Sequence, residues 1–199
     1  PDVSLVGYCM GGLLSVCYQA THPDSPVKNL ACFTTPVNGD GMVLYKKWLT
    51  SRSFDMDRVV DELGVIHTEI INMEMHALRP LHKNANQLKL LNNVDNDEFV
   101  KAHLRFERWA VDQLPFPGAL AKEFMIDFVR DNKLIKKELR LNGTIADLSN
   151  ITVPFLHVAA SFDHIVPEAS SKDLIGMVGS EDKKEIIVRG GNVMSLIQS

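Results

Sequence analysis

A cysteine between glycines is the residue whose surroundings most directly suggest chemistry. Residues 7–12 read Gly-Tyr-Cys-Met-Gly-Gly, and they follow an apolar run and precede a segment able to form a helix. This pattern is typical of a nucleophile held on a strained strand-to-helix turn, which needs very small neighbours two positions to either side, here Gly7 and Gly11. Cys9 is therefore a candidate nucleophile.

The same turn is expected to activate the thiol. At the start of the following helix, the backbone dipole and unpaired N–H groups favour the thiolate of Cys9. The Met10 N–H is a candidate for half of an oxyanion hole, and we expect the other half from a loop before residue 1. The alternative for Cys9 is a buried structural thiol, since a free cysteine behaves as a small hydrophobic residue.

Asp163 is the candidate acid. It lies in the segment 161–167, Ser-Phe-Asp-His-Ile-Val-Pro, directly after the strand-like run 155–160. A chain order of nucleophile, acid and base puts the acid at such a position. The alternative for Asp163 is a helix cap or an ordinary loop carboxylate. His164 follows it directly and is not expected to turn back and bridge Asp163 to Cys9.

Asn192 stands where the same chain order expects a histidine. The predicted strand 184–188 leads into a loop that reads Arg-Gly-Gly-Asn-Val-Met. An amide is neither a useful base nor an acid near neutral pH, so it can orient a group but cannot accept the thiol proton. Cysteine tolerates this loss better than serine because part of it is thiolate unaided, yet losing a general base costs about 10²–10⁴-fold in rate.

Composition excludes several classes of protein. The 199 residues are 45% hydrophobic and 23% charged, which is ordinary for a globular domain. A net charge of -4, with 21 basic and 25 acidic residues, offers no basic stripe for nucleic acid. No apolar run is long enough to cross a bilayer. The three cysteines have no metal-ligand spacing, so we expect no metal and a reducing compartment.

The elements predicted around these residues alternate between strand and helix. Short apolar runs at 3–6, 29–35, 155–160 and 184–188 predict strands of a mostly parallel sheet, with His157 packed in the core. Residues 13–20 should form the helix after the turn. An Asn-Gly pair at 142–143 predicts a hairpin.

A long helical insertion interrupts this sheet pattern. Helical spacing runs from about residue 38 to 132, with a helix that ends at Gly64 and a rigid loop at 114–118, Leu-Pro-Phe-Pro-Gly. We expect 1–37 to carry the nucleophile turn, 38–137 to form a helical lid and 138–199 to complete the core. The chain lacks an initiator methionine and reaches its first strand at once, so the first strands of the fold are expected to be missing from it.

The motifs together resemble a known family. The boxes at 7–12, 162–167 and 190–193, and the stretch 107–118, resemble polyhydroxyalkanoate synthases, particularly the shorter catalytic subunits of the two-subunit classes. The resemblance implies an α/β-hydrolase fold with an inserted lid. It carries the family's nucleophile to Cys9 and its acid to Asp163, and its histidine to the position of Asn192, where this sequence departs.

The resemblance also implies an activity. A cysteine thiolate would attack a (R)-3-hydroxyacyl-coenzyme A, release coenzyme A, and pass the acyl group to the hydroxyl of a growing polyester chain, with no cofactor. It implies a homodimer, a smaller second synthase subunit and a cytoplasmic location at the surface of polyester granules. Two other functions stay open: a thioesterase or depolymerase of the same fold, and a weakened or inactive paralogue that binds granules or a partner subunit, for which Asn192 is the supporting feature.

Overall fold

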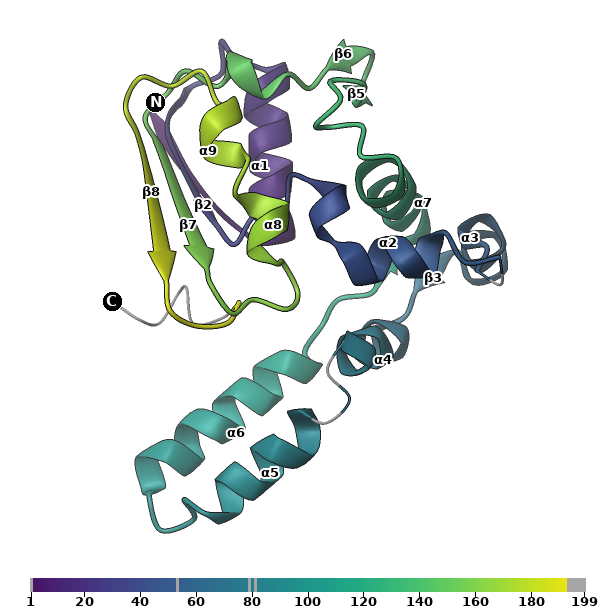
Figure 1. Cartoon of the computed structure of the whole chain (residues 1–199), viewed down its shortest axis with the longest axis vertical. Helices are drawn as coiled ribbons and strands as arrows, with labels where there is room; N and C mark the ends of the chain where they lie inside the picture. The colour runs from purple at the N-terminus through teal and green to yellow at the C-terminus, as the bar shows by residue number, and fades with distance from the viewer. Residues whose placement is uncertain (1, 53, 79, 81, 193–199) are drawn as a thin grey trace. The chain divides into compact units, whose positions relative to one another are not determined.

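The computed structural model of the chain describes residues 2–52, 54–78, 80 and 82–192 (Figure 1). The chain divides into two compact units, one made of Pro1–Met56 with Glu123–Ser199 and the other of Asp57–Lys122. No helix in the described ranges is long and apolar enough to cross a membrane.

The first unit is built around four parallel strands in the order β1-β2-β7-β8. These strands are β1 (Val3–Tyr8), β2 (Val27–Phe33), β7 (Phe155–Ala160) and β8 (Lys183–Val188). All four coincide with the apolar runs that predicted them, and the mostly parallel sheet is confirmed. Because the strands are parallel, the residues that follow each of them meet at one edge of the sheet.

Three helices pack on this sheet, and α1 (Met10–Thr21) does so through a stripe of buried apolar side chains on one of its faces. The contacts join α1 to β1 and β2, α8 (Glu168–Ser171) to β7 and α9 (Leu174–Met177) to β8. Figure 1 draws the three helices on the same side of the sheet. The buried residues Leu13, Val16, Cys17 and Ala20 of α1 recur at the spacing of one helix face, so burial of this stripe holds the helix on the sheet.

The segments on either side of the second unit belong to the first. They contain the short 3-10 turn η1 (Gly39–Gly41), α2 (Val43–Leu49), the π-helix η2 (Glu123–Arg130), the hairpin of β5 (Arg140–Leu141) and β6 (Thr144–Ile145), and the 3-10 turn η3 (Leu148–Asn150). The hairpin predicted at 142–143 is confirmed, with Arg140 paired to Ile145. The sequence predicts helical spacing to about residue 132, and near its end Glu123–Arg130 forms a π-helix rather than an α-helix.

A polar network centred on the buried Asn132 joins these segments to one another and to the residue that precedes α9. Asn132 accepts a hydrogen bond from Gly39 N at 2.8 Å and donates to Asn38 Oδ1 at 2.9 Å, and Asn38 in turn donates to Asp173 Oδ2 at 2.6 Å. A Cβ at Gly39 would lie 2.9 Å from the carbonyl carbon of Val129. The close backbone approach joins Gly39 to Val129 within the first unit, and the predicted insertion 38–137 extends beyond the second unit, Asp57–Lys122.

The second unit is mainly helical, as expected for the insertion. Its elements are α3 (Met56–Leu63), β3 (Val65–Ile66), α4 (Thr68–Leu78), α5 (His82–Leu91), α6 (Asp97–Val111), β4 (Phe116–Pro117) and α7 (Gly118–Lys122). The helix α3 ends before Gly64, whose φ of 65° suits a glycine, as the sequence predicts. The prediction of a rigid loop at 114–118 is wrong in one respect, because Phe116 pairs with Ile66 in an antiparallel bridge.

His157 is the buried histidine that the sequence predicts in the core. Its register partners are Cys32 on β2 and Glu185 on β8. The side chain is fully buried, and Nδ1 lies 2.9 Å from Glu185 Oε1. Burial lowers the pKa of His157, and the carboxylate of Glu185 opposes this only in part. The folded protein therefore holds a neutral imidazole at this position.

The neutral state of His157 predicts a loss of stability in acid. The unfolded residue takes up a proton below its ordinary pKa of 6.5, and the folded residue resists this protonation. The contribution of His157 to the free energy of unfolding is therefore fully present above that pH and is lost as the pH falls below it. Urea unfolding at about pH 7.5 and about pH 5.5 measures the difference. We expect His157→Gln to reduce it, with His22→Gln at an exposed position as the matched control. An equal pH dependence in wild type and His157→Gln would contradict the prediction.

Candidate active site

The strained turn expected at Cys9 is present between β1 and α1. Cys9 has φ 52° and ψ -118°, a conformation that residues with a Cβ rarely adopt. Its N–H donates to Phe33 O at 2.8 Å, and its carbonyl accepts from Gly12 N at 3.0 Å and from Leu13 N at 3.2 Å. The neighbouring strand and the first turn of the helix therefore hold the strained residue from both sides.

The close approach that permits this turn lies at Gly7 and Gly12. A Cβ at Gly7 would lie 2.5 Å from Gly12 Cα, and a Cβ at Gly12 would overlap the hydroxyl of Thr35 and lie 2.9 Å from its Cβ. Gly11 has open space around it, with nothing within 4 Å among the described residues. The steric reason expected for Gly11 is therefore wrong for this structure, and Gly12 takes its place.

Two loops meet at the carboxyl edge of the sheet and bring Asp163 to Asn192. Ser161 N donates to Val188 O at 3.0 Å, and Phe162 N donates to Gly190 O at 2.9 Å. Asn192 Nδ2 then donates to Asp163 Oδ2 at 2.6 Å. Both side chains are buried, so this is a shielded polar pair. Val193, the last residue of the predicted 190–193 motif, lies outside the described residues.

The second oxygen of Asp163 is held by its own loop. Asp163 Oδ1 accepts from Ile165 N and from Val166 N, both at 2.8 Å. The carboxylate is thus fixed on one side by backbone and on the other by the Asn192 amide. This geometry suits a carboxylate that orients the neighbouring side chain. In this chain that side chain is the amide of Asn192 rather than an imidazole.

Sequence reasoning missed Tyr8. Its hydroxyl donates to Asn192 Oδ1, so the phenol and the carboxylate bind opposite ends of one amide. Burial raises the pKa of Tyr8, and the negative charges of Cys9 and Asp163 raise it further, which places the phenol beside both groups. The only signal in the sequence was its position next to Cys9 in the glycine box.

Comparison with known families agrees with this strand–turn–helix site. The family described as alpha/beta hydrolase fold matches residues 1–196. The chain belongs to this α/β-hydrolase family. The predicted fold class is confirmed, including the parallel sheet that carries the elbow.

Curated relatives of this α/β-hydrolase are polymerases of polyesters. The Poly(3-hydroxyalkanoate) polymerase subunit PhaC of Allochromatium vinosum is 34% identical over 198 residues, which cover 96% of this chain and 54% of that protein. The subunit of the same name from Haloferax mediterranei is 31% identical, with 96% and 39% covered. The one from Synechocystis sp. is 34% identical, with 85% and 46% covered. The resemblance predicted from the motifs is confirmed, and the chain spans about half the length of these relatives.

Solved structures agree on the fold. MenH from S. aureus matches with a TM-score of 0.53 at 18% identity, over 98% of this chain and 62% of that one. BpoC from Mycobacterium tuberculosis matches with a TM-score of 0.51 at 11% identity, over 98% and 62%. At these identities the likeness concerns the α/β-hydrolase fold alone.

The hydrolase elbow holds its cysteine as a neutral thiol. Burial raises the pKa of Cys9 to about 11 and outweighs the hydrogen bond from the Met10 N–H, which lowers it. The charge of Asp163 raises the pKa further, and a hydrogen bond from the Asn192 side chain lowers it. The prediction that the turn favours the thiolate is therefore wrong in its net effect, because desolvation exceeds the help from the helix start.

Burial also dominates the pKa of Asp163. Loss of solvent raises the pKa of its carboxyl, while hydrogen bonds from Val166 N, the Asn192 amide and Ile165 N lower it.

The four predicted groups, Cys9, the Met10 N–H, Asp163 and Asn192, lie together in one site. None of the described residues forms a cluster of three His, Cys, Asp or Glu side chains able to hold a metal ion.

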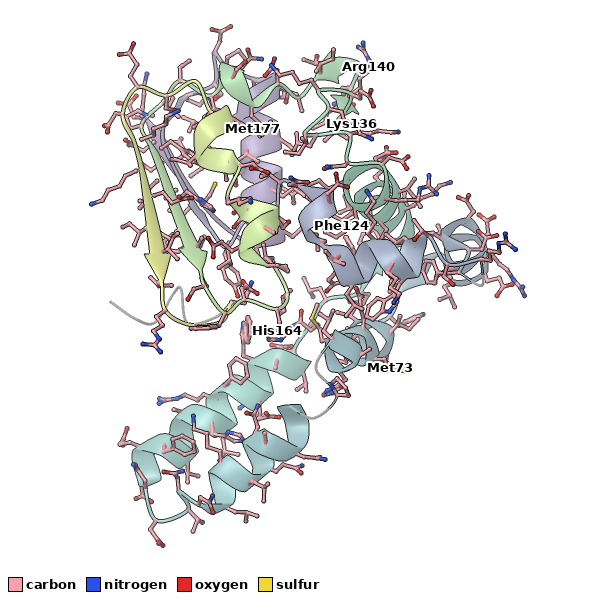
Figure 2. The ribbon with its side chains drawn as sticks, in the orientation of Figure 1. Met73, Phe124, Lys136, Arg140, His164 and Met177 are labelled. Carbon is pink, nitrogen blue, oxygen red and sulfur yellow. The ribbon has the colours of Figure 1, made fainter. Side chains whose placement is uncertain are left out.

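Two more polar residues lie at this edge of the sheet. Thr34 directly follows β2, has φ 43° and is buried, and its N–H donates to Val158 O at 2.7 Å. It is a second strained residue beside the elbow. His164 lies at the end of the sheet where β7 and β8 finish, as Figure 2 shows.

The packing at Gly12 predicts a clear difference between neighbouring glycines. Gly12→Ala should destabilise the protein by about 1–3 kcal/mol, because its Cβ would overlap Thr35. The matched control is Gly11→Ala, which has room for the methyl group and should be neutral or stabilising by about 0.5–1 kcal/mol. Urea unfolding of both variants measures the effects. Equal losses at the two positions would contradict the assigned close approach.

The raised pKa of Cys9 predicts slow alkylation at neutral pH. Since the pKa is about 11, the rate with iodoacetamide should rise about tenfold per pH unit between about pH 7 and about pH 10. Mass spectrometry of the peptide that contains Cys9 follows the reaction, and Cys9→Ser is the control. Cys17 and Cys32 are buried and should label more slowly. A rate that already levels off near neutral pH would show that the thiol is activated after all.

Proposed function

We propose that this chain carries the catalytic centre of a polyhydroxyalkanoate synthase, an acyltransferase that joins (R)-3-hydroxyacyl units from their coenzyme A thioesters. The observation that carries the proposal is a cysteine at the nucleophile elbow of a chain whose curated relatives are poly(3-hydroxyalkanoate) polymerases. A thiol suits this reaction because thiol–thioester exchange is nearly balanced in energy. The coenzyme A thioester is the substrate, and the proposal needs no cofactor.

The proposed reaction has two steps. Cys9 Sγ attacks the thioester carbonyl, the bond from that carbonyl to the coenzyme A sulfur breaks, and the thiol proton leaves with coenzyme A. The hydroxyl of a second acyl unit then attacks the carbonyl of the Cys9 thioester and forms an ester. The bond from that carbonyl to Cys9 Sγ breaks, and the hydroxyl proton passes to the cysteine sulfur. The Met10 N–H, which hydrogen-bonds the sulfur in the resting site, would stabilise the oxyanion in both steps.

Asn192 limits this mechanism. The amide can hold Asp163 and donate to the sulfur, but it cannot carry a proton from the thiol to the leaving group. The thiol proton must therefore pass to water or directly to the departing sulfur. We expect a slow acyl transfer that speeds up as the pH rises toward the pKa of Cys9.

The setting of the reaction is part of the proposal. The relatives are named as subunits, and with the motif resemblance this leads us to include a second, smaller synthase subunit and a homodimer of the catalytic chain in the proposal. We include in the proposal a cytoplasmic site of action at the surface of polyester granules, which the motif resemblance implies. Exclusion of water from the acyl-enzyme, the role expected of a lid, would favour alcoholysis over hydrolysis.

A second candidate function is favoured by one observation. Asn192 makes a short hydrogen bond to Asp163 in a buried site, so the position of the base is filled by a stable amide pair. A paralogue that has lost catalysis and binds granules or a partner subunit would show this feature. The two functions differ in whether any acyl transfer depends on Cys9.

Coenzyme A release from (R)-3-hydroxybutyryl-coenzyme A tests the proposal. In the intact protein with its second subunit, Cys9→Ala should abolish release, and Asn192→His should raise it by about 10²–10⁴-fold because it restores a general base. Thiol detection of free coenzyme A follows the reaction. Release that persists in Cys9→Ala would reject the cysteine mechanism, and no release from any folded variant would favour the binding paralogue.

A further inference from the structure

The amide of Asn192 is held by two partners that agree on its orientation. Asp163 Oδ2, a carboxylate oxygen, accepts from Nδ2 at 2.6 Å, and the phenol of Tyr8 donates to Oδ1. An asparagine amide has one end that accepts and one end that donates, and its neighbours decide which way it faces. The acceptor at one end and the donor at the other select the same arrangement.

We propose that Tyr8 is a positioning residue for Cys9, because its phenol occupies the Asn192 oxygen and leaves the amide N–H to face Asp163 and the cysteine sulfur. The inference rests on the proposed role of Cys9 as the nucleophile. Tyr8, which belongs to the elbow itself, would thus join the groups that set the ionisation state of the Cys9 thiol.

The position of Tyr8 makes this role possible. It is the last residue of β1 and directly precedes Cys9, so the backbone that strains the cysteine also fixes the phenol. The ring is half-buried, and its hydroxyl reaches across to the loop after β8. Asn192 itself is buried, so water competes little with this hydrogen bond.

The consequence depends on which atom of the amide meets the sulfur. An N–H that donates to sulfur stabilises the thiolate, whereas an amide oxygen would accept the S–H proton and stabilise the neutral thiol. The hydrogen bond from the Asn192 side chain lowers the pKa of Cys9, which fits the donating arrangement. Without the phenol, the buried amide oxygen lacks this donor and Asp163 alone holds the amide, so its N–H is fixed less firmly toward the sulfur and stabilises the thiolate less.

The test measures the thiol and requires no turnover. In the intact protein, Tyr8→Phe should slow iodoacetamide alkylation of Cys9 by about threefold to tenfold at a fixed pH below 9, and should move the pH–rate profile of alkylation to higher pH by the matching half to one pH unit. The matched control is Tyr18→Phe on α1, at an exposed position, which should leave the profile unchanged. An unchanged profile in Tyr8→Phe would overturn the proposal.

A double-mutant cycle separates positioning from simple packing. In Asn192→Ala, the added change Tyr8→Phe should have no effect on the alkylation profile, since the phenol acts through the amide. The same slowing in both backgrounds would overturn the proposal. If Tyr8→Phe does not fold, 3-fluorotyrosine at position 8 keeps the ring and donates more strongly, so alkylation should become faster; no change would again overturn it.

These outcomes are distinct from those of the proposed function. Alkylation needs neither coenzyme A nor a second subunit, so the role of Tyr8 is decided even when the protein releases no coenzyme A. Conversely, an effect on coenzyme A release in Tyr8→Phe without a shift of the alkylation profile would reject positioning and leave the acyltransferase proposal intact.

Discussion

The strained backbone of Cys9 is the constraint on which the rest of the site depends. A residue with φ near 52° between a strand and a helix is stable only where the surroundings determine it fully. Gly7 and Gly12 approach within contact, Thr35 fills the remaining space, and Phe33 O holds the cysteine N–H. The same turn sets the direction of the Met10 N–H and of the Tyr8 ring, so three neighbouring groups of one short box face the reaction centre.

Close packing at the elbow has an electrostatic consequence. The contacts that hold the cysteine also remove water from it, and desolvation raises the pKa of the thiol to about 11. Hydrogen bonds from Met10 N–H and Asn192 act in the opposite direction and are smaller in effect. The site therefore holds a neutral thiol next to a buried carboxylate. At the position where a histidine would carry the proton, this chain has the amide of Asn192.

Several features could be predicted from residues alone because they depend on local chemistry. Apolar runs of strand length marked all four sheet strands, Asn142-Gly143 marked the hairpin and Gly64 the end of a helix. Others depend on contacts distant in sequence. Asn38 hydrogen-bonds to Asn132 and Asp173 within the first unit, and Phe116 pairs with Ile66 although its neighbours are prolines.

The site divides in the same way. The sequence by itself determined where the candidate nucleophile, the candidate acid and the amide at the expected position of the base stand in the chain, because their order follows from the topology of the parallel sheet. Only the tertiary structure decided that Gly12 rather than Gly11 makes the close approach, that burial outweighs the helix start at Cys9, and that Tyr8 binds Asn192. Desolvation and hydrogen bonding depend on atoms brought together from β1, β2 and the loops after β7 and β8, and no local pattern of residues records that proximity.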